Sequence, residues 1–198
     1  MAETLFTIKS QGESKVTEKM SRFYGFACHA STVEEARDII RRFTNEYHDA
    51  RHVCWAYAIG VGDDIQRQCN DNGEPSGTAG KPIAGQLLSF SLTDTVVIVI
   101  RYFGGIKLGT GGLTVAYRTA AREAIEAAEL EERQILEEIS FTFPYLAMNE
   151  VMKLVKQRGI EILSQQFDNT CSMKVRIRQS EANEFKSYLF SLSGVTQS

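Results

Sequence analysis

Two short stretches of the sequence concentrate the groups that can bind or transform a ligand. The first, DNGEPSGTAGKP, begins at Asp71 and places the carboxylate of Glu74 three residues later. A carboxylate pair at this spacing can bind a cation, accept hydrogen bonds from an arginine or act in general acid/base chemistry. The second, RYFGGIKLGTGG, begins at Arg101 and holds five glycines together with Lys107. Free backbone amides and cations in one loop indicate the binding of an anion.

The glycine-rich stretch lies between an expected strand, TVVIVI, and an expected helix, LTVAYRTAAREAIEAAEL. A turn of this kind exposes N–H groups beside the positive end of the helix dipole, which favours a phosphate. The nucleotide motifs nevertheless fail, because Thr110 stands where a P-loop needs lysine and GTGGLT lacks the last glycine of a dinucleotide fingerprint. No cofactor is therefore predicted. The alternative interpretation is that the glycines only allow two elements to approach closely.

The candidate binding residues share these two loops or the helix that follows. They are Asp71, Glu74, Ser76, Thr78, Lys81, Arg101, Tyr102, Phe103, Gly104, Gly105, Lys107, Gly109, Thr110, Gly111 and Arg118. Asp71 and Glu74 are also weak candidates for catalysis, and no residue is a firm one. Two alternatives remain open: Asp71 and Asn72 can simply fix a turn, and Arg118 can lie on a solvated helix face.

A metal site is a further, weaker hypothesis. His52 and Cys54 lie two apart on an expected strand and so share one face, and His29 can approach from a neighbouring strand. No HxxxH, HExxH or CxxC pair supports the site, so no metal is predicted. Cys54 beside His52 is a weak candidate nucleophile, since buried strand thiols are usually inert.

The composition is that of a soluble globular protein. The chain has 198 residues, of which 43% are apolar and 24% charged, and its formal net charge is −3. The first part, to Arg133, holds 15 basic and 18 acidic residues, and the remainder holds 7 of each. Binding of nucleic acid through bulk charge is therefore disfavoured, whereas a local basic site is not. The polar, acid-containing amino terminus and scattered cysteines indicate a cytoplasmic protein without a membrane segment or disulfides.

The periodicity divides the chain into two domains, residues 1–133 and 134–198. The first is expected to be an α/β domain with the order ββαβαβα. Its strands are expected at residues 5–10, 22–30, 52–60 and 94–103, and its helices at 32–48, from a cap at Ser76 or Thr78, and at 113–130. Strand 94–103 is apolar at successive positions, which is typical of a strand covered on both faces.

The second domain is expected to follow the order β-α-β-β-α, with GVTQS as a stub of a last strand. The elements are expected at residues 138–143, 145–158, 160–167, 171–179 and 180–192. This order is close to a ferredoxin-like split βαβ fold. Alternation in CSMKVRIRQ places Lys174, Arg176 and Arg178 on one face. Such a stripe can follow a nucleic-acid backbone, although a solvated face is the simpler interpretation.

DNGEPSGTAGKPI, followed by VVIVIRYFGGIKLGTGGLTVAYRTAAREAI, resembles the IMPACT protein family and its two-domain, YigZ-like bacterial branch. The resemblance covers about residues 1 to 130. Matching positions are Asp71, Gly73, Glu74, Pro75, Gly77, Thr78, Ala79, Gly80, Arg101, Tyr102, Phe103, Gly104, Gly105, Leu108, Gly109, Gly111 and Gly112, with His52 and Trp55 also where the family has such residues. The resemblance also implies that Glu74 lies against Arg101.

The resemblance implies an α+β fold. Its first domain would be similar to ribosomal proteins and to domain IV of elongation factor G, with a left-handed βαβ crossover against the usual rule. Its second would be similar to the ferredoxin-like domain V of that factor. Eukaryotic family members are translation regulators that bind a ribosome-associated activator of an initiation-factor kinase. The implication for this chain is a connection with translation or RNA.

Three hypotheses on function follow. The leading one is a non-catalytic module that binds RNA or a ribosome-associated component at a surface site formed by both loops. The second is an enzyme acting on a phosphate-bearing substrate, with Glu74 or Asp71 as acid/base and the glycine loop plus Arg101 as stabiliser. The third is a protein-interaction module in which Tyr102 and Phe103 are exposed anchors.

Overall fold

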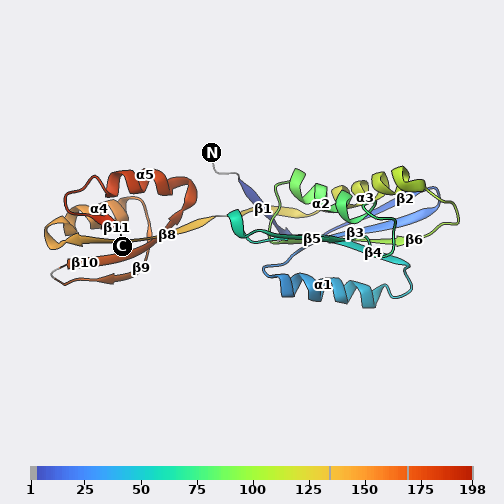
Figure 1. Ribbon diagram of the computed structural model, residues 1–198, viewed down its shortest axis with the longest axis horizontal. Helices are drawn as coiled ribbons and strands as arrows, with labels where there is room; N and C mark the ends of the chain where they lie inside the picture. Colours follow the sequence, from blue (N-terminus) through green and yellow to red (C-terminus); the bar gives the residue numbers. More distant parts are fainter. Residues whose placement is uncertain (1–3, 134, 169, 198) are drawn as a thin grey trace. The chain divides into compact units, whose positions relative to one another are not determined.

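The computed structural model describes residues 4–133, 135–168 and 170–197 (Figure 1). The chain forms two compact units, one from Thr4 to Arg133 and one that holds the residues after it. Helices and mostly antiparallel sheets occur in both, so the predicted α+β class is confirmed. None of the described helices is both long and apolar enough to cross a membrane.

A five-stranded sheet forms the centre of the first unit. In spatial order its strands are β2 (Gly12–Glu18), β3 (Ser21–His29), β6 (Thr95–Tyr102), β4 (His52–Ile59) and β5 (Gln66–Asn70), and each neighbouring pair is antiparallel. The short helix η1 (Gly62–Asp64) joins β4 to β5. A second, two-stranded sheet pairs β1 (Leu5–Ser10) with β7 (Glu129–Arg133).

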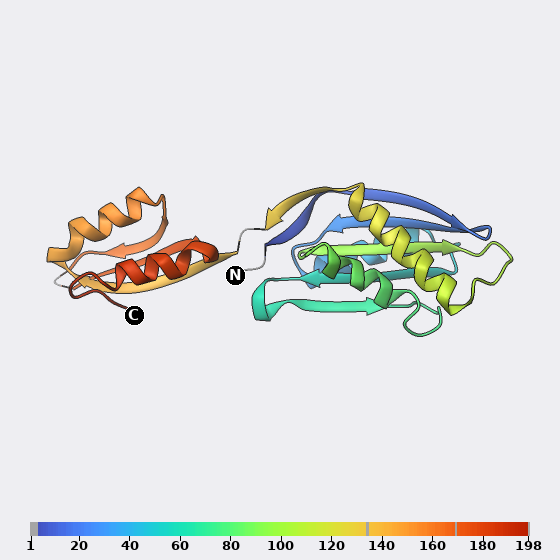
Figure 2. The same cartoon turned by 90° about the horizontal axis from the view of Figure 1, so that it is seen from above.

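Helices cover both faces of the large sheet. Helix α1 (Val33–Glu46) lies on one face, and α2 (Gly80–Ser89) and α3 (Gly109–Glu126) lie side by side on the other (Figures 1 and 2). The central strand β6 is consequently buried on both faces, as its uninterrupted apolar run predicts. Thr32 caps α1 by accepting a hydrogen bond from the Glu35 amide.

Strands β2, β5 and β7 were not predicted from the sequence. Their residues are mostly exposed and polar, so they give no apolar run and no clear alternation. Each becomes a strand because a neighbouring strand satisfies its backbone hydrogen bonds. The crossover from β3 through α1 to β4 joins two strands that flank β6, and its left-handedness stays a prediction.

The second unit follows the order β-α-β-β-α-β. Its elements are β8 (Leu136–Pro144), η2 (Tyr145–Ala147), α4 (Met148–Gln157), β9 (Glu161–Gln166), β10 (Thr170–Arg178), α5 (Gln179–Leu189) and β11 (Thr196–Gln197). The sheet order is β11-β8-β10-β9. The expected stub of a last strand does form, as β11, which pairs with β8. Helices α4 and α5 pack on one face of this sheet around Phe141, Val151 and Phe185.

The other face of this sheet carries the basic stripe noted in the sequence. Lys174 and Arg176 both bond to Glu138 of the adjacent strand, and Arg176 also approaches Glu161 at 3.4 Å. Their charge is therefore compensated locally. This favours the interpretation as a solvated face.

Candidate functional site

The two loops identified in the sequence meet at one pocket. The pocket has a volume of about 400 Å³ and lies in the first unit, where β4 begins, β6 ends and α3 begins. Its lining residues are Arg51, His52, Gly73, Glu74, Pro75, Arg101, Phe103, Lys107, Leu108, Gly109, Thr110 and Leu113. Seven of the predicted binding residues are thus brought together: Glu74, Arg101, Phe103, Lys107, Gly109 and Thr110 line it, and Gly111 follows in the same helical turn.

A buried ion pair joins the loops. Nη1 of Arg101, at the end of β6, donates to Oε1 of Glu74 at 2.6 Å, as the resemblance implies. The hydroxyl of Tyr117, on α3, donates to the same oxygen at 2.9 Å. The Glu74 and Arg101 side chains are only 3% and 7% exposed. The first loop, the end of β6 and helix α3 are therefore tied together at a single carboxylate.

The Arg101 guanidinium lies between aromatic rings. Its central carbon is 5.6 Å from the ring centroid of Phe23 and 5.5 Å from that of Phe103. Its Nε is buried without a hydrogen-bond partner among the described residues. Because its charge is already compensated by Glu74, Arg101 acts first to position the loops and adds little free positive charge to the pocket.

His52 is held in a defined orientation at the pocket wall. Its Nδ1 lies 2.9 Å from the carbonyl oxygen of Asn72, so Nδ1 carries the hydrogen and donates it. In the neutral ring Nε2 then has a free lone pair. This Nε2 is 3.8 Å from Oε1 of Glu74, beyond hydrogen-bond distance. His52 thus offers the pocket an acceptor when neutral and a donor when protonated.

Asp71 has a structural role beside the pocket. One carboxylate oxygen accepts hydrogen bonds from the amides of Ala79 and Gly80, and the other accepts from Gly77. Desolvation is the largest single effect and raises the pKa of Asp71. The three backbone hydrogen bonds and the positive charge of the nearby Lys81 together outweigh it, so the pKa lies below its usual value. Asp71 therefore stabilises the start of α2 across the loop.

The predicted cap of α2 at Ser76 or Thr78 was wrong. The N-cap residue is Ala79, whose side chain makes no capping hydrogen bond, and Asp71 bonds the first amides instead. Thr78 is buried and donates to the Pro75 carbonyl, whereas Ser76 and Lys81 are exposed and lie outside the pocket lining. The sequence next to the helix start does not reveal the cap, because the capping carboxylate of Asp71 lies eight residues before the N-cap position.

The start of α3 differs from that of α2, because no side chain caps it and its first turn has no acidic residue. Gly109, at φ +71°, turns the chain into the helix, and Gly109 and Thr110 line the pocket. A Cβ added at Gly111 would meet open space. The first amides of this 18-residue helix are therefore accessible, with Lys107 exposed beside them.

Four predicted binding residues have other positions. Tyr102 follows Arg101 on β6 and so points to the opposite face, where its hydroxyl donates to Asp49 at 2.6 Å, a hydrogen bond that raises the pKa of Tyr102 to about 12. Gly104 packs against the backbone of Met20. Gly105, at φ +89°, turns the exposed loop, and Arg118 is exposed farther along α3. None of the four lines the pocket.

The suggested approach of His29 to His52 and Cys54 was wrong. His29 pairs with Thr95 on β6 whereas His52 pairs with Arg101, six residues away along that strand. His29 instead bonds the side chains of Thr7 and Ser31. Among the described residues no group of three or more His, Cys, Asp and Glu side chains is arranged to hold a metal ion.

Cys54 is sealed below the pocket. Its thiol donates to the Asp71 carbonyl at 2.9 Å, and burial raises the pKa of Cys54 to about 12. A thiol with this pKa stays protonated near neutral pH, which does not suit a nucleophile. Tyr117 and Arg51 are site residues that the sequence does not reveal. Tyr117 lies within the expected helix 113–130, Arg51 lies directly before the expected strand 52–60, and no motif marks either of them.

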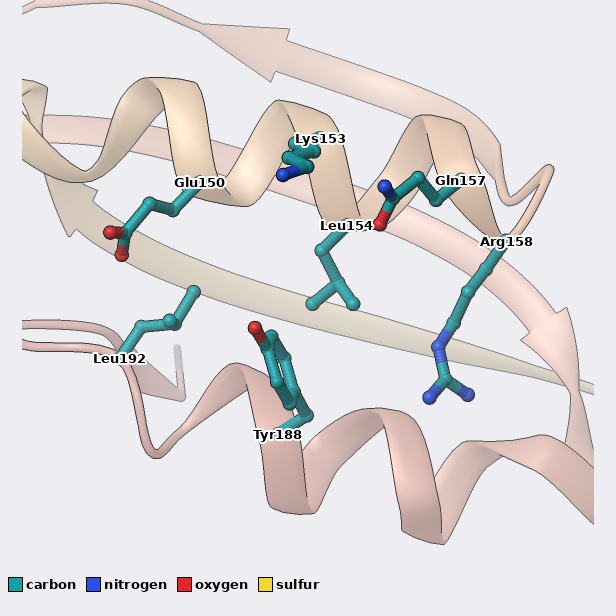
Figure 3. Close-up of a pocket in the computed structure, with 7 residues that line it drawn as sticks. All are labelled: Glu150, Lys153, Leu154, Gln157, Arg158, Tyr188 and Leu192. Atoms are coloured by element: carbon teal, nitrogen blue, oxygen red, sulfur yellow. The ribbon is translucent and has the colours of Figure 1, made fainter.

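A second cavity, of about 410 Å³, lies in the second unit between α4 and α5 (Figure 3). Leu154 of α4 and Tyr188 of α5 extend toward each other across it. Arg158 at one end is bound to Glu184 at 2.7 Å. This cavity is lined by none of the motif residues, so the first pocket is the better candidate site.

Comparison with known proteins identifies the family. Residues 19–125 match the Impact N-terminal domain, and this range contains the whole lining of the first pocket. The chain belongs to the IMPACT family. Its relatives include IMPACT family member YvyE of Bacillus subtilis, 32% identical over 193 residues that cover 98% of this chain and 88% of the relative. IMPACT family member YigZ of Escherichia coli is 32% identical over 176 residues, 88% of this chain and 86% of the relative.

The chain is also similar to a solved crystal structure that is described as that of a hypothetical protein. It superposes with a TM-score of 0.68 at 29% sequence identity, and the match covers 100% of this chain and 97% of the other. The fold is therefore similar to that of a solved protein along the whole length of this chain.

Proposed function

We propose that this IMPACT family protein is a non-catalytic binding protein connected with translation, and that the pocket binds the phosphate groups of RNA on or near the ribosome. The connection with translation rests on membership of the IMPACT family, because its eukaryotic members are translation regulators. The binding of phosphate rests on the pocket.

The observation that carries the proposal is the uncapped start of α3 at the pocket. Accessible amides at the positive end of an 18-residue helix favour an anion. Lys107 and Arg51 add positive charge at the same pocket, and the structure gives neither an ion-pair partner among the described residues. The acid in the pocket, Glu74, is already compensated by Arg101. Positive charge at the pocket is therefore not fully compensated by acidic side chains, although the chain as a whole is acidic.

Binding of single-stranded RNA oligonucleotides at several salt concentrations tests the proposal. The affinity should fall steeply as salt rises, and Lys107→Ala and Arg51→Ala should each weaken binding about three- to tenfold and flatten the salt slope. Arg37→Ala is the matched control, because it removes one positive charge from exposed α1 on the opposite face of the sheet. RNA binding that is absent, or that Arg37→Ala weakens as much as Lys107→Ala, would contradict the proposal.

A protein-interaction function has one observation in its favour. Met20, Phe103 and Ile106 are 69%, 47% and 48% exposed, and the turn at Met20 packs against Gly104 in the glycine-rich loop. Exposed apolar side chains on adjacent turns can anchor a protein partner. Binding of a protein partner would favour this function over RNA binding if that binding does not depend on salt and is lost in the Ile106→Ser variant.

A further inference from the structure

We propose that the pocket is a site for one terminal ribonucleotide, which places its phosphate at the start of α3 and its base against Phe103. This inference rests on the proposed function and makes it narrower. The ligand is a ribonucleotide carrying a phosphomonoester, either free or at the end of an RNA chain.

The size and the walls of the pocket set the class of ligand. A volume of about 400 Å³ is near the lower end of the range for small-molecule sites, about 300–1,000 Å³, and suits one nucleotide better than a strand. Gly109, Thr110 and Lys107 make one part of the lining polar. Phe103 and Leu113 make another part apolar. A ligand that fits must therefore combine an anion with a flat or apolar group.

The phosphate position has two independent supports. The first is the uncapped helix start, with no acid in its first turn. The second is a pair of cations, Lys107 and Arg51, which line the pocket and have no ion-pair partner among the described residues. So many donors around a single group favour a phosphomonoester, which carries about −1.5 to −2 charge near neutral pH, over an internal diester with one charge.

The base position depends on Phe103, which is 47% exposed at the pocket. The Arg101 guanidinium lies 5.5 Å from the centroid of its ring and holds the ring in place, while the exposed part remains available. An exposed aromatic ring beside positive charge is a stacking surface for any base.

The ribose position depends on His52. Because Nδ1 donates to the Asn72 carbonyl, the neutral ring presents Nε2 to the pocket as a hydrogen-bond acceptor. Oε1 of Glu74, 3.8 Å away, cannot donate to it in its ionised form. A ligand hydroxyl can, which favours a sugar with free hydroxyls.

Competition for a fluorescent single-stranded RNA with a 5′-phosphate tests the inference at constant ionic strength. Adenosine 5′-monophosphate should compete about tenfold better than adenosine, and better than its 2′,3′-dideoxy form. The same RNA with hydroxyl groups at both ends should bind about tenfold more weakly. Phe103→Ala should weaken competition by adenosine 5′-monophosphate about fivefold but leave competition by inorganic phosphate unchanged. Phe167→Ala, which removes a 45% exposed ring from the second unit, is the matched control and should change neither.

The outcomes separate the inference from the proposed function. If RNA binds equally well with and without a terminal phosphate and adenosine 5′-monophosphate does not compete, the inference fails while RNA binding stands. If the mononucleotide binds but no RNA does, the inference holds with a free nucleotide as ligand and the proposed function fails. If neither binds, both fail.

Discussion

Arg101 and Glu74 form a buried ion pair that joins two loops separated by 27 positions in the sequence. The pair is buried, it shares its carboxylate with Tyr117, and it lies under the pocket. Its geometry explains why a strand of aliphatic residues ends in an arginine. It also limits what either residue can do chemically, because a carboxylate engaged by two donors is a poor base.

Removal of one partner of this pair should strongly destabilise the first unit. Glu74→Gln or Arg101→Met should each lower the free energy of unfolding by about 3–5 kcal/mol, because an uncompensated charge stays buried. The double variant Glu74→Gln/Arg101→Met should lose less than the sum of the two, which denaturant titrations of all four proteins measure. Additive losses would show that the two side chains are not coupled. Lys9→Met, at an exposed pair with Glu129, is the control and should leave the stability essentially unchanged.

Asp71 gives a prediction on pH. Because the folded state lowers its pKa, its stabilising effect is fully present above the unfolded value of about 3.9 and is lost as pH falls from there through the folded value. Asp71→Ala should cost about 1–2 kcal/mol at pH 7 by removing the bonds to the amides at the start of α2. The difference between wild type and variant, measured by urea unfolding, should shrink below pH 4. A difference that stays constant down to pH 2 would contradict the capping role.

The fold was more predictable from the sequence than the site. Strands with an apolar run, such as β6, and helices with a clear stripe, such as α1, follow from short-range periodicity. The polar strands β5 and β7 do not, because their pairing partners decide their structure.

The site depends on contacts over longer distances. The sequence shows the glycine-rich loops and the charged residues. It does not show which of these charged side chains form ion pairs and which remain available to a ligand. Arg101 looked like a ligand-binding cation and is an ion-pair partner, whereas Arg51 gave no signal and lines the pocket. Sequence spacing shows which residue types are near one another along the chain, and only the register of β4 against β6 brings His52 beside Arg101.

The cysteines should differ sharply in reactivity. Burial raises the pKa of Cys54 to about 12 and that of Cys28 to about 11, and Cys171 is buried as well. Cys69 is exposed on β5. A thiol reagent at pH 7.5 should therefore modify Cys69 first, and Cys69→Ser should remove the fast phase. Rapid modification of Cys54 in the folded protein, found by peptide mapping, would contradict its burial and reopen its candidacy as a nucleophile.

Two glycines of the same loop region should respond in opposite ways to alanine. A Cβ at Gly104 would lie 2.1 Å from the carbonyl carbon of Met20, and backbone there cannot move aside cheaply. Gly104→Ala should therefore destabilise the protein by about 1–3 kcal/mol. Gly111 is in the first turn of α3 and faces open space, so Gly111→Ala should leave stability unchanged or raise it by up to about 1 kcal/mol. Denaturation midpoints distinguish the two. Equal losses would mean that the glycines serve a common conformational need, whereas the predicted difference would show that Gly104 permits close packing and that the fold does not require a glycine at position 111.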